Sequence, residues 1–158
     1  MISRRLILAL PPLAFSIWAV PSTANTPDAL AQAIAACWRA RGINFTSDQV
    51  AARIGGRKGK AALLALAGAT ESADDEGVET MVEIVWEAGA PPSPALPLMA
   101  RDLANGLPLL VLARDGRAWL LERRTGDQLS VVDPLTGHKQ LLALASAVLI
   151  GRPVIAGA

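Results

Sequence analysis

The stretch from Leu107 to Gly137, LPLLVLARDGRAWLLERRTGDQLSVVDPLTG, decides the fold of this chain. Its apolar runs are short, and they are separated by Asp115-Gly116 and by Thr125-Gly126-Asp127. Such pairs favour tight turns between antiparallel strands. We therefore expect five short strands, over residues 107–113, 118–123, 129–132, 139–142 and 148–156.

The residues before this stretch carry a helical pattern instead. Thr26-Pro27-Asp28 is typical of a helix start, because Thr caps, Pro suits the first helical position and Asp complements the positive end of the helix dipole. Gly42 suits the left-handed position that closes a helix. Between these signals, apolar residues recur at helical spacing, at Leu30, Ile34, Cys37 and Trp38.

Further helices are expected before the strands begin. Thr46 and Gln49 form a capping box for a short second helix that ends at Gly55-Gly56. The spacing of apolar residues from Val78 to Trp86 predicts an amphipathic helix, and the acidic residues 70–77 before it predict a loop. Two more helices are expected over residues 60–67 and 96–105. Helices followed by an antiparallel sheet predict an α+β domain, with N-terminal helices packed on a C-terminal sheet.

The N-terminus has the features of a secretory signal. Arg4-Arg5 precedes an apolar stretch over residues 6–20, and Ser22-Thr23-Ala24 supplies small residues for cleavage after Ala24. We expect a signal peptide over residues 1–24 and a single domain over residues 25–158. The exported protein is then periplasmic or secreted, with no membrane span after cleavage. A short membrane anchor and a twin-arginine signal remain as alternatives.

Composition limits the kinds of function that the chain can have. A length of 158 residues suits one domain, and a net charge of +1 gives no electrostatic argument for binding nucleic acid. One cysteine, Cys37, excludes an intramolecular disulfide, and one histidine, His138, leaves too few ligands for a structural zinc site. We therefore expect no metal and no cofactor.

The order of these elements resembles the papain-like cysteine peptidases of the bacteriocin-processing (double-glycine leader) type and related exported papain-like peptidases. The resemblance covers about residues 26–150. It is best over residues 106–137, whereas the helical half is matched by pattern only. In such families a cysteine opens the first helix, a histidine lies on one strand, and an aspartate followed by proline lies on the next.

The resemblance implies where those three groups would lie in this chain. The nucleophile position falls at Ala29, the histidine position at Arg117 or Ala118, and the aspartate at Asp133. Ala29 has no nucleophile, and Arg117 cannot act as a base because guanidinium stays protonated. By resemblance the chain is a pseudopeptidase.

The leading hypothesis for its function is therefore an exported, non-catalytic papain-like domain that binds a peptide or protein partner in the former cleft. Four residues are expected to line that cleft, namely Asp28, Arg117, Trp119 and Asp133. Two alternatives remain: a working hydrolase with a non-standard catalytic set, and a structural component of an envelope or secretion assembly that uses an exposed sheet edge.

Several residues have a simpler interpretation beside the functional one. Cys37 lies eight residues beyond Ala29, about 12 Å along a helix, so it is expected to be a buried small residue rather than a rescuing nucleophile. His138 is expected to be a solvated turn residue. Asp133 caps its own turn or forms a salt bridge with Arg117. The basic residues Arg53, Arg57, Lys58 and Lys60 are expected on the surface.

Overall fold

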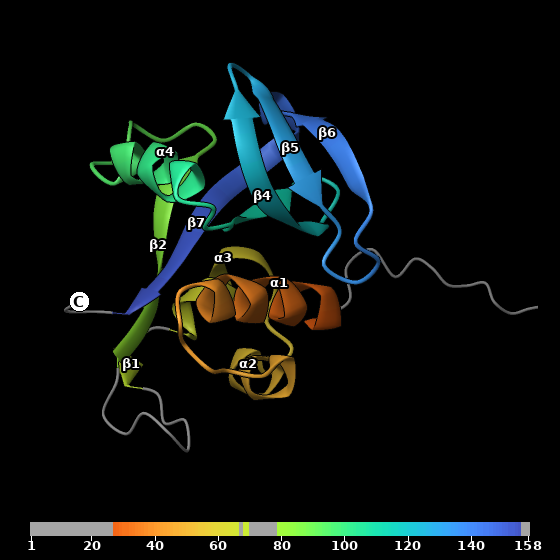
Figure 1. Cartoon of the computed structure of the whole chain (residues 1–158). Coiled ribbons are helices and arrows are strands. Elements are labelled where there is room, and N and C mark those ends of the chain that lie inside the picture. Colours follow the sequence, from red (N-terminus) through yellow and green to blue (C-terminus); the bar gives the residue numbers. More distant parts are fainter. Residues whose placement is uncertain (1–26, 67, 70–78, 156–158) are drawn as a thin grey trace, which may run out of the picture.

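The computed structural model describes residues 27–66, 68–69 and 79–155, and it shows an α+β fold in which helices cover a twisted antiparallel sheet (Figure 1). The predicted signal peptide and the predicted loop over residues 70–77 lie outside these residues. In chain order, three helices come first, then two strands, a fourth helix and five strands.

The first helix forms as its apolar stripe predicts. Helix α1 spans Pro27–Ala40, and Gly42 closes it with a φ of +85°. The stripe is buried, because Leu30, Ile34 and Trp38 are between 0% and 8% exposed. Trp38 also packs against Phe45 in the following loop, with ring centroids 5.2 Å apart. The stripe therefore fixes one face of α1 against the rest of the molecule.

Three shorter helices complete the helical part of the fold. Helix α2 spans Ser47–Ile54 and has the predicted capping box: Gln49 N donates to Thr46 Oγ1 at 3.1 Å, and Thr46 N donates to Gln49 Oε1 at 2.9 Å. Helix α3 spans Gly59–Leu64, and α4 spans Leu96–Ala104. None of the helices within the described residues has both the length and the apolarity that crossing a membrane requires.

The sheet has seven strands in the order β1-β2-β7-β3-β4-β5-β6, and every neighbouring pair is antiparallel. Strand β7 therefore lies inside the sheet, between β2 and β3. The bounds are β1 Gly68–Ala69, β2 Glu79–Glu87, β3 Leu109–Ala113, β4 Ala118–Thr125, β5 Gln128–Val132, β6 Lys139–Ala143 and β7 Ala147–Ile155. A short 3-10 turn over Leu144–Ser146 joins β6 to β7.

One secondary-structure prediction is wrong. The segment expected to form an amphipathic helix over residues 78–86 is strand β2, which pairs with β7 from Thr80–Ile155 to Glu87–Leu149. A bulge between Ile84 and Trp86 interrupts the alternation of the strand. The apolar residues Met81, Val82, Val85 and Trp86 therefore recur at the spacing expected of a helix. The sheet is accordingly not confined to the C-terminal half, since β1 and β2 precede α4.

The sheet has a hydrophobic core on each face. Side chains of β3 alternate between them: Leu110 and Leu112 pack with α1, α2 and α3, whereas Leu109, Val111 and Ala113 pack with the cluster that contains Met99 of α4. This explains why all five residues of β3 are buried. Figure 1 shows the same arrangement, with α1 below the sheet and α4 beside β2 and β7.

Candidate functional site

A cavity of about 180 Å³ lies where α1 begins beneath the strands β4 and β5. It brings together Ala29, Arg117, Trp119 and Asp133, which come from three separate parts of the chain. The remaining lining residues are Ala118, Leu135 and Thr136. The three positions that the resemblance implies for a catalytic centre, Ala29, Arg117 and Asp133, thus line one cavity, which we call the α1 cavity.

Arg117 and Trp119 both line the α1 cavity, and Trp119 also packs in the core cluster that contains Met99. The guanidinium carbon of Arg117 lies 5.8 Å from the centre of the Trp119 ring, within the range of a cation–π contact. Trp119 is only 4% exposed, and its indole Nε1 has no hydrogen-bond partner in the described part of the chain. These two side chains offer donors and a positive charge, but no group that accepts a proton at neutral pH.

Asp133 fulfils the predicted turn role. Its Oδ1 atom accepts hydrogen bonds from Leu135 N at 2.8 Å and from Thr136 N at 3.3 Å. The salt bridge to Arg117 that the sequence left open does not form. Among the ion pairs of the described residues, the acidic partner of Arg117 is Asp115, at 4.0 Å. The Asp133 carboxylate is instead held by the amides of its own turn.

Ala29 and Asp28 occupy the start of α1. Ala29 lies on the wall of the cavity and is 7% exposed. Its methyl group supplies no nucleophile at the position where the resemblance places one. Asp28 lies in α1, but its side chain lies outside the described part of the structure, so its predicted place in the cleft stays a prediction.

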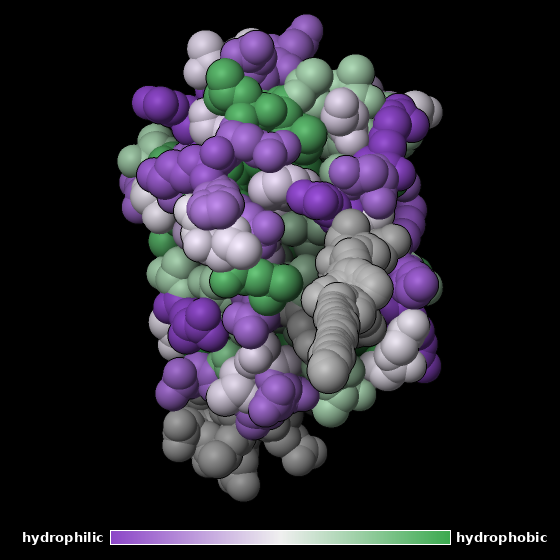
Figure 2. Space-filling model, turned by 90° about the vertical axis from the view of Figure 1, so that its right-hand side faces the viewer, coloured by the Kyte–Doolittle hydropathy of each residue, from purple (hydrophilic) through white to green (hydrophobic). Residues whose placement is uncertain are grey.

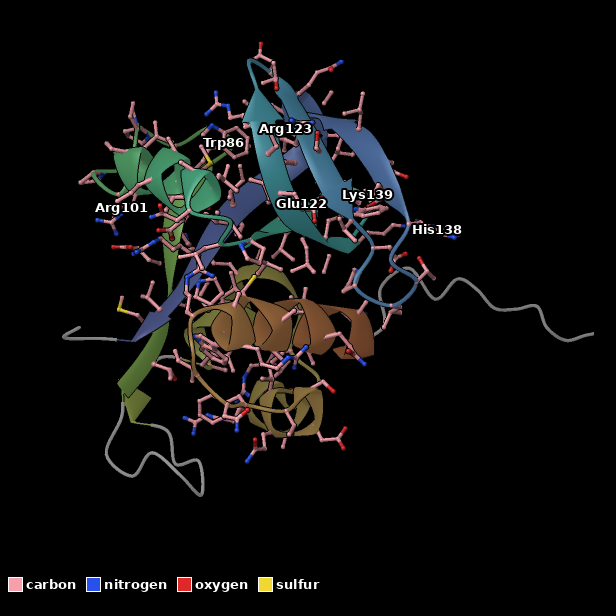
Figure 3. The ribbon with its side chains drawn as sticks, viewed as in Figure 1. Trp86, Arg101, Glu122, Arg123, His138 and Lys139 are labelled. Atoms are coloured by element: carbon pink, nitrogen blue, oxygen red, sulfur yellow. The ribbon has the colours of Figure 1, made fainter. Side chains whose placement is uncertain are left out.

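Cys37 and His138 do not form an alternative catalytic pair. Cys37 is fully buried, and burial raises the pKa of its thiol to about 12, although the charge of Arg41 opposes that rise. The thiol therefore stays protonated at neutral pH. His138 is an exposed turn residue, and Figure 3 shows it pointing out from the edge of the sheet. Both predictions for these residues are confirmed.

A second cavity lies beside the first, and no sequence pattern predicts it. It measures about 200 Å³ and lies between the turn into α3, the start of α1 and the strands β3 and β7. The predicted surface residues Arg57, Lys58 and Lys60 are indeed exposed, and they line the mouth of this cavity. Ala118 belongs to the walls of both cavities. We call this second one the α3 cavity.

A buried ionic cluster was also not predicted. Arg41 Nη2 donates to Asp102 Oδ2 at 2.8 Å, and Arg152 Nε donates to the same oxygen. Arg152 Nη1 in turn donates to Glu83 Oε1 at 3.2 Å. Burial alone would raise the pKa of Asp102, but hydrogen bonds and charges from the two arginines outweigh it and lower that pKa. In sequence, Asp102 resembles an ordinary surface residue on a helix.

The outer surface adds no broad apolar face on the side where α1 begins. Figure 2 shows this side, and outside the grey atoms its hydrophobic residues form separate patches divided by hydrophilic ones. No group of three or more His, Cys, Asp or Glu side chains within the described residues could hold a metal ion.

Comparison of the chain with known protein families, with curated proteins and with solved structures finds no match.

Proposed function

We propose that this chain is an exported, non-catalytic domain of the papain-like type that binds an extended peptide segment in the cleft between α1 and β4. One observation carries the proposal. Ala29, Arg117, Trp119 and Asp133 lie far apart in the sequence, yet they line a single cavity. A binding cleft requires such convergence.

The chemistry of the site supports binding without hydrolysis. Nucleophilic catalysis needs an activated nucleophile within hydrogen-bond reach of a base. The α1 cavity has a methyl group at Ala29 and a guanidinium at Arg117, which stays protonated. The only thiol, Cys37, is buried elsewhere with a pKa raised to about 12. No observation favours a hydrolase with a non-standard catalytic set.

The size of the cavities supports a peptide as the occupant. Pockets for drug-sized molecules usually measure about 300–1,000 Å³, whereas these two measure about 180 and 200 Å³. A cavity of roughly 150 Å³ already holds a benzene ring, so each one fits a single side chain. Because Ala118 separates them, an extended chain crossing Ala118 can place one side chain in each.

Peptide display on the purified mature chain, residues 25–158, tests this proposal. Random linear peptides should be enriched over a bead control, and the bound peptides should be recovered uncut. Thr136→Trp should abolish the enrichment, because Thr136 is exposed and a large ring there fills the α1 cavity. Asn44→Trp is the matched control, since Asn44 is an exposed loop residue outside the cavity. No enrichment, or cleaved peptides, would overturn the proposal.

A second candidate function is assembly through strand β6. This strand is the last in the sheet order, and Leu141 on it is 63% exposed. An unpaired edge with an exposed leucine can add a strand from another chain. Light scattering on the mature chain should then show a dimer or larger species that Leu141→Lys converts to a monomer. A monomeric wild type would exclude self-assembly through this edge.

A further inference from the structure

The α3 cavity lies next to the proposed peptide cleft, because the two share part of a wall. Ala118 lines both cavities, and Leu30 in the wall of the α3 cavity directly follows Ala29 in the wall of the α1 cavity. A peptide that occupies the first cavity therefore passes the mouth of the second. The two cavities differ in chemistry, because Arg57, Lys58 and Lys60 line only the second one.

The floor of the α3 cavity is apolar. Leu30, Leu112 and Leu149 contribute side chains that are 8%, 8% and 1% exposed. Val148 lines the cavity and is 38% exposed. With a volume of about 200 Å³, the cavity can hold a side chain of the size of Leu, Met or Phe, since roughly 150 Å³ suffices for a benzene ring.

The mouth of the α3 cavity is cationic. Three basic residues, Arg57, Lys58 and Lys60, face one acid, Glu87. Lys60 Nζ lies 3.3 Å from both carboxylate oxygens of Glu87, so these two charges are paired. Arg57 Nη1 donates to Ile54 O at 2.9 Å and keeps its positive charge. Among the ion pairs of the described residues, Lys58 has none. Two positive charges at the mouth are therefore not neutralised.

We infer that the α3 cavity selects the peptide: it accepts one Leu, Met or Phe side chain from a segment that carries Asp or Glu two residues away. Residues i and i+2 of an extended chain lie on the same side, about 7 Å apart. An apolar side chain in the cavity thus places the acid over the cationic mouth. This inference rests on the proposed function, because it requires a peptide in the neighbouring cleft.

Synthetic nonapeptide libraries with two fixed positions test the selection. The fixed pair is Leu-x-Asp, Leu-x-Lys or Ser-x-Asp, and all other positions are random. Titration calorimetry with the mature chain should show Leu-x-Asp binding at least about tenfold more tightly than either other library, which corresponds to about 1.4 kcal/mol for each preference. The preference for Asp over Lys should shrink as salt is added, because the charges are exposed.

Two variants separate the apolar and ionic contributions. Val148→Trp should fill the cavity and remove the preference for Leu over Ser, whereas Leu64→Trp, at an exposed position outside the cavity, should keep it. Lys58→Glu should remove or reverse the preference for Asp over Lys. Lys139→Glu on strand β6 changes the same charge outside the cavity and should leave that preference intact.

The outcomes distinguish this inference from the proposed function. Equal binding of all three libraries, still blocked by Thr136→Trp, would overturn the selection and leave the peptide cleft standing. Binding of 4-phenylbutyrate in the α3 cavity as tightly as Leu-x-Asp would assign the cavity to a small amphiphile and also overturn the inference. Binding of none of the libraries would overturn both proposals.

Discussion

Arg41 Nη2 lies 2.8 Å from Oδ2 of Asp102, so the residue that follows α1 is joined by an ion pair to a residue of α4, 61 positions later in the chain. Arg41 also donates to Cys37 O at 3.0 Å and to Pro108 O at 2.8 Å. Asp102 is 2% exposed and shares its carboxylate with Arg152 of β7. The Arg41 side chain thus joins the end of α1 to α4 and to Pro108, just before β3 begins.

Replacing Asp102 with Asn should lower the free energy of unfolding at pH 7 by about 3–5 kcal/mol, because removing one partner of a buried pair leaves the other charges uncompensated. The two charges concerned are Arg41 and Arg152, which are 8% and 14% exposed. Urea denaturation followed by tryptophan fluorescence measures the change. Arg101→Ala is the control, because Arg101 also pairs with Asp102, at 3.8 Å, but is 60% exposed, so its loss should cost little.

Acid should destabilise the protein by protonating the carboxyl group of Asp102. Since folding lowers the pKa of Asp102, its stabilising contribution is complete above the ordinary aspartate pKa of about 3.9 and is lost as the pH falls through the lower folded value. Wild type should therefore lose stability below about pH 4 more steeply than Asp102→Asn. Urea midpoints across that range test this expectation. Parallel curves for the two proteins would contradict the assignment.

The thiol of Cys37 should resist alkylation while the protein is folded. It is fully buried, and burial raises its pKa to about 12, so both access and thiolate are lacking at pH 8. Iodoacetamide should label it slowly in buffer and rapidly in urea, as followed by mass spectrometry. A Leu64→Cys variant provides the positive control, because residue 64 is 66% exposed. Fast labelling of native Cys37 would instead support the alternative of a hydrolase with a non-standard catalytic set.

Gly151 of β7 leaves room for the side chain of Val82 on the neighbouring strand β2. It pairs with both Ile84 and Leu110, and a Cβ atom there would lie 2.8 Å from Val82 Cγ1. Val82 is stiff because it is β-branched. Gly151→Ala should therefore destabilise the protein by about 1–3 kcal/mol. Adding Val82→Ala should recover part of that loss, and a double-mutant cycle in urea measures the coupling. Simple additivity would contradict the contact.

Thr46→Ala should cost about 1 kcal/mol of stability, because it removes the side-chain acceptor for Gln49 N at the start of α2. Gln49→Ala should cost less, since it leaves that acceptor in place and removes the bond from Thr46 N and a long one, 3.4 Å, from Thr46 Oγ1. Thermal unfolding followed by circular dichroism compares the two. The reverse order of stability would show that the capping box is not the origin of the effect.

The parts of the fold that follow local rules could be predicted from the sequence. The capping box at Thr46, the buried stripe ending at Trp38 and the strands around Asp115-Gly116 depend on residues close together in the chain. Strand β2 could not be predicted correctly. Its apolar spacing imitated a helix, and only pairing with β7, about seventy residues later, decides its conformation.

The candidate site was predictable to a similar extent. The sequence predicts a shared cleft for Arg117, Trp119 and Asp133, and these residues line one cavity together with Ala29. The partner of Arg117 was not predictable, because Asp115 and Asp133 both accept amide hydrogen bonds within their own turns, and only the folded arrangement brings Asp115 within 4.0 Å of Arg117. The α3 cavity and the cluster around Asp102 join elements distant in sequence, so no local pattern marks them.

The position of β7 between β2 and β3 has a consequence for the order of folding. Strands β1 and β2 reach β3, β4, β5 and β6 only through β7, the last strand in chain order. Before β7 is in place, the two groups of strands have no shared hydrogen bonds and their cores stay open to water. Long-range pairing of this kind slows folding, because a large loop must close first. The chain should thus remain unfolded until its final strand is available.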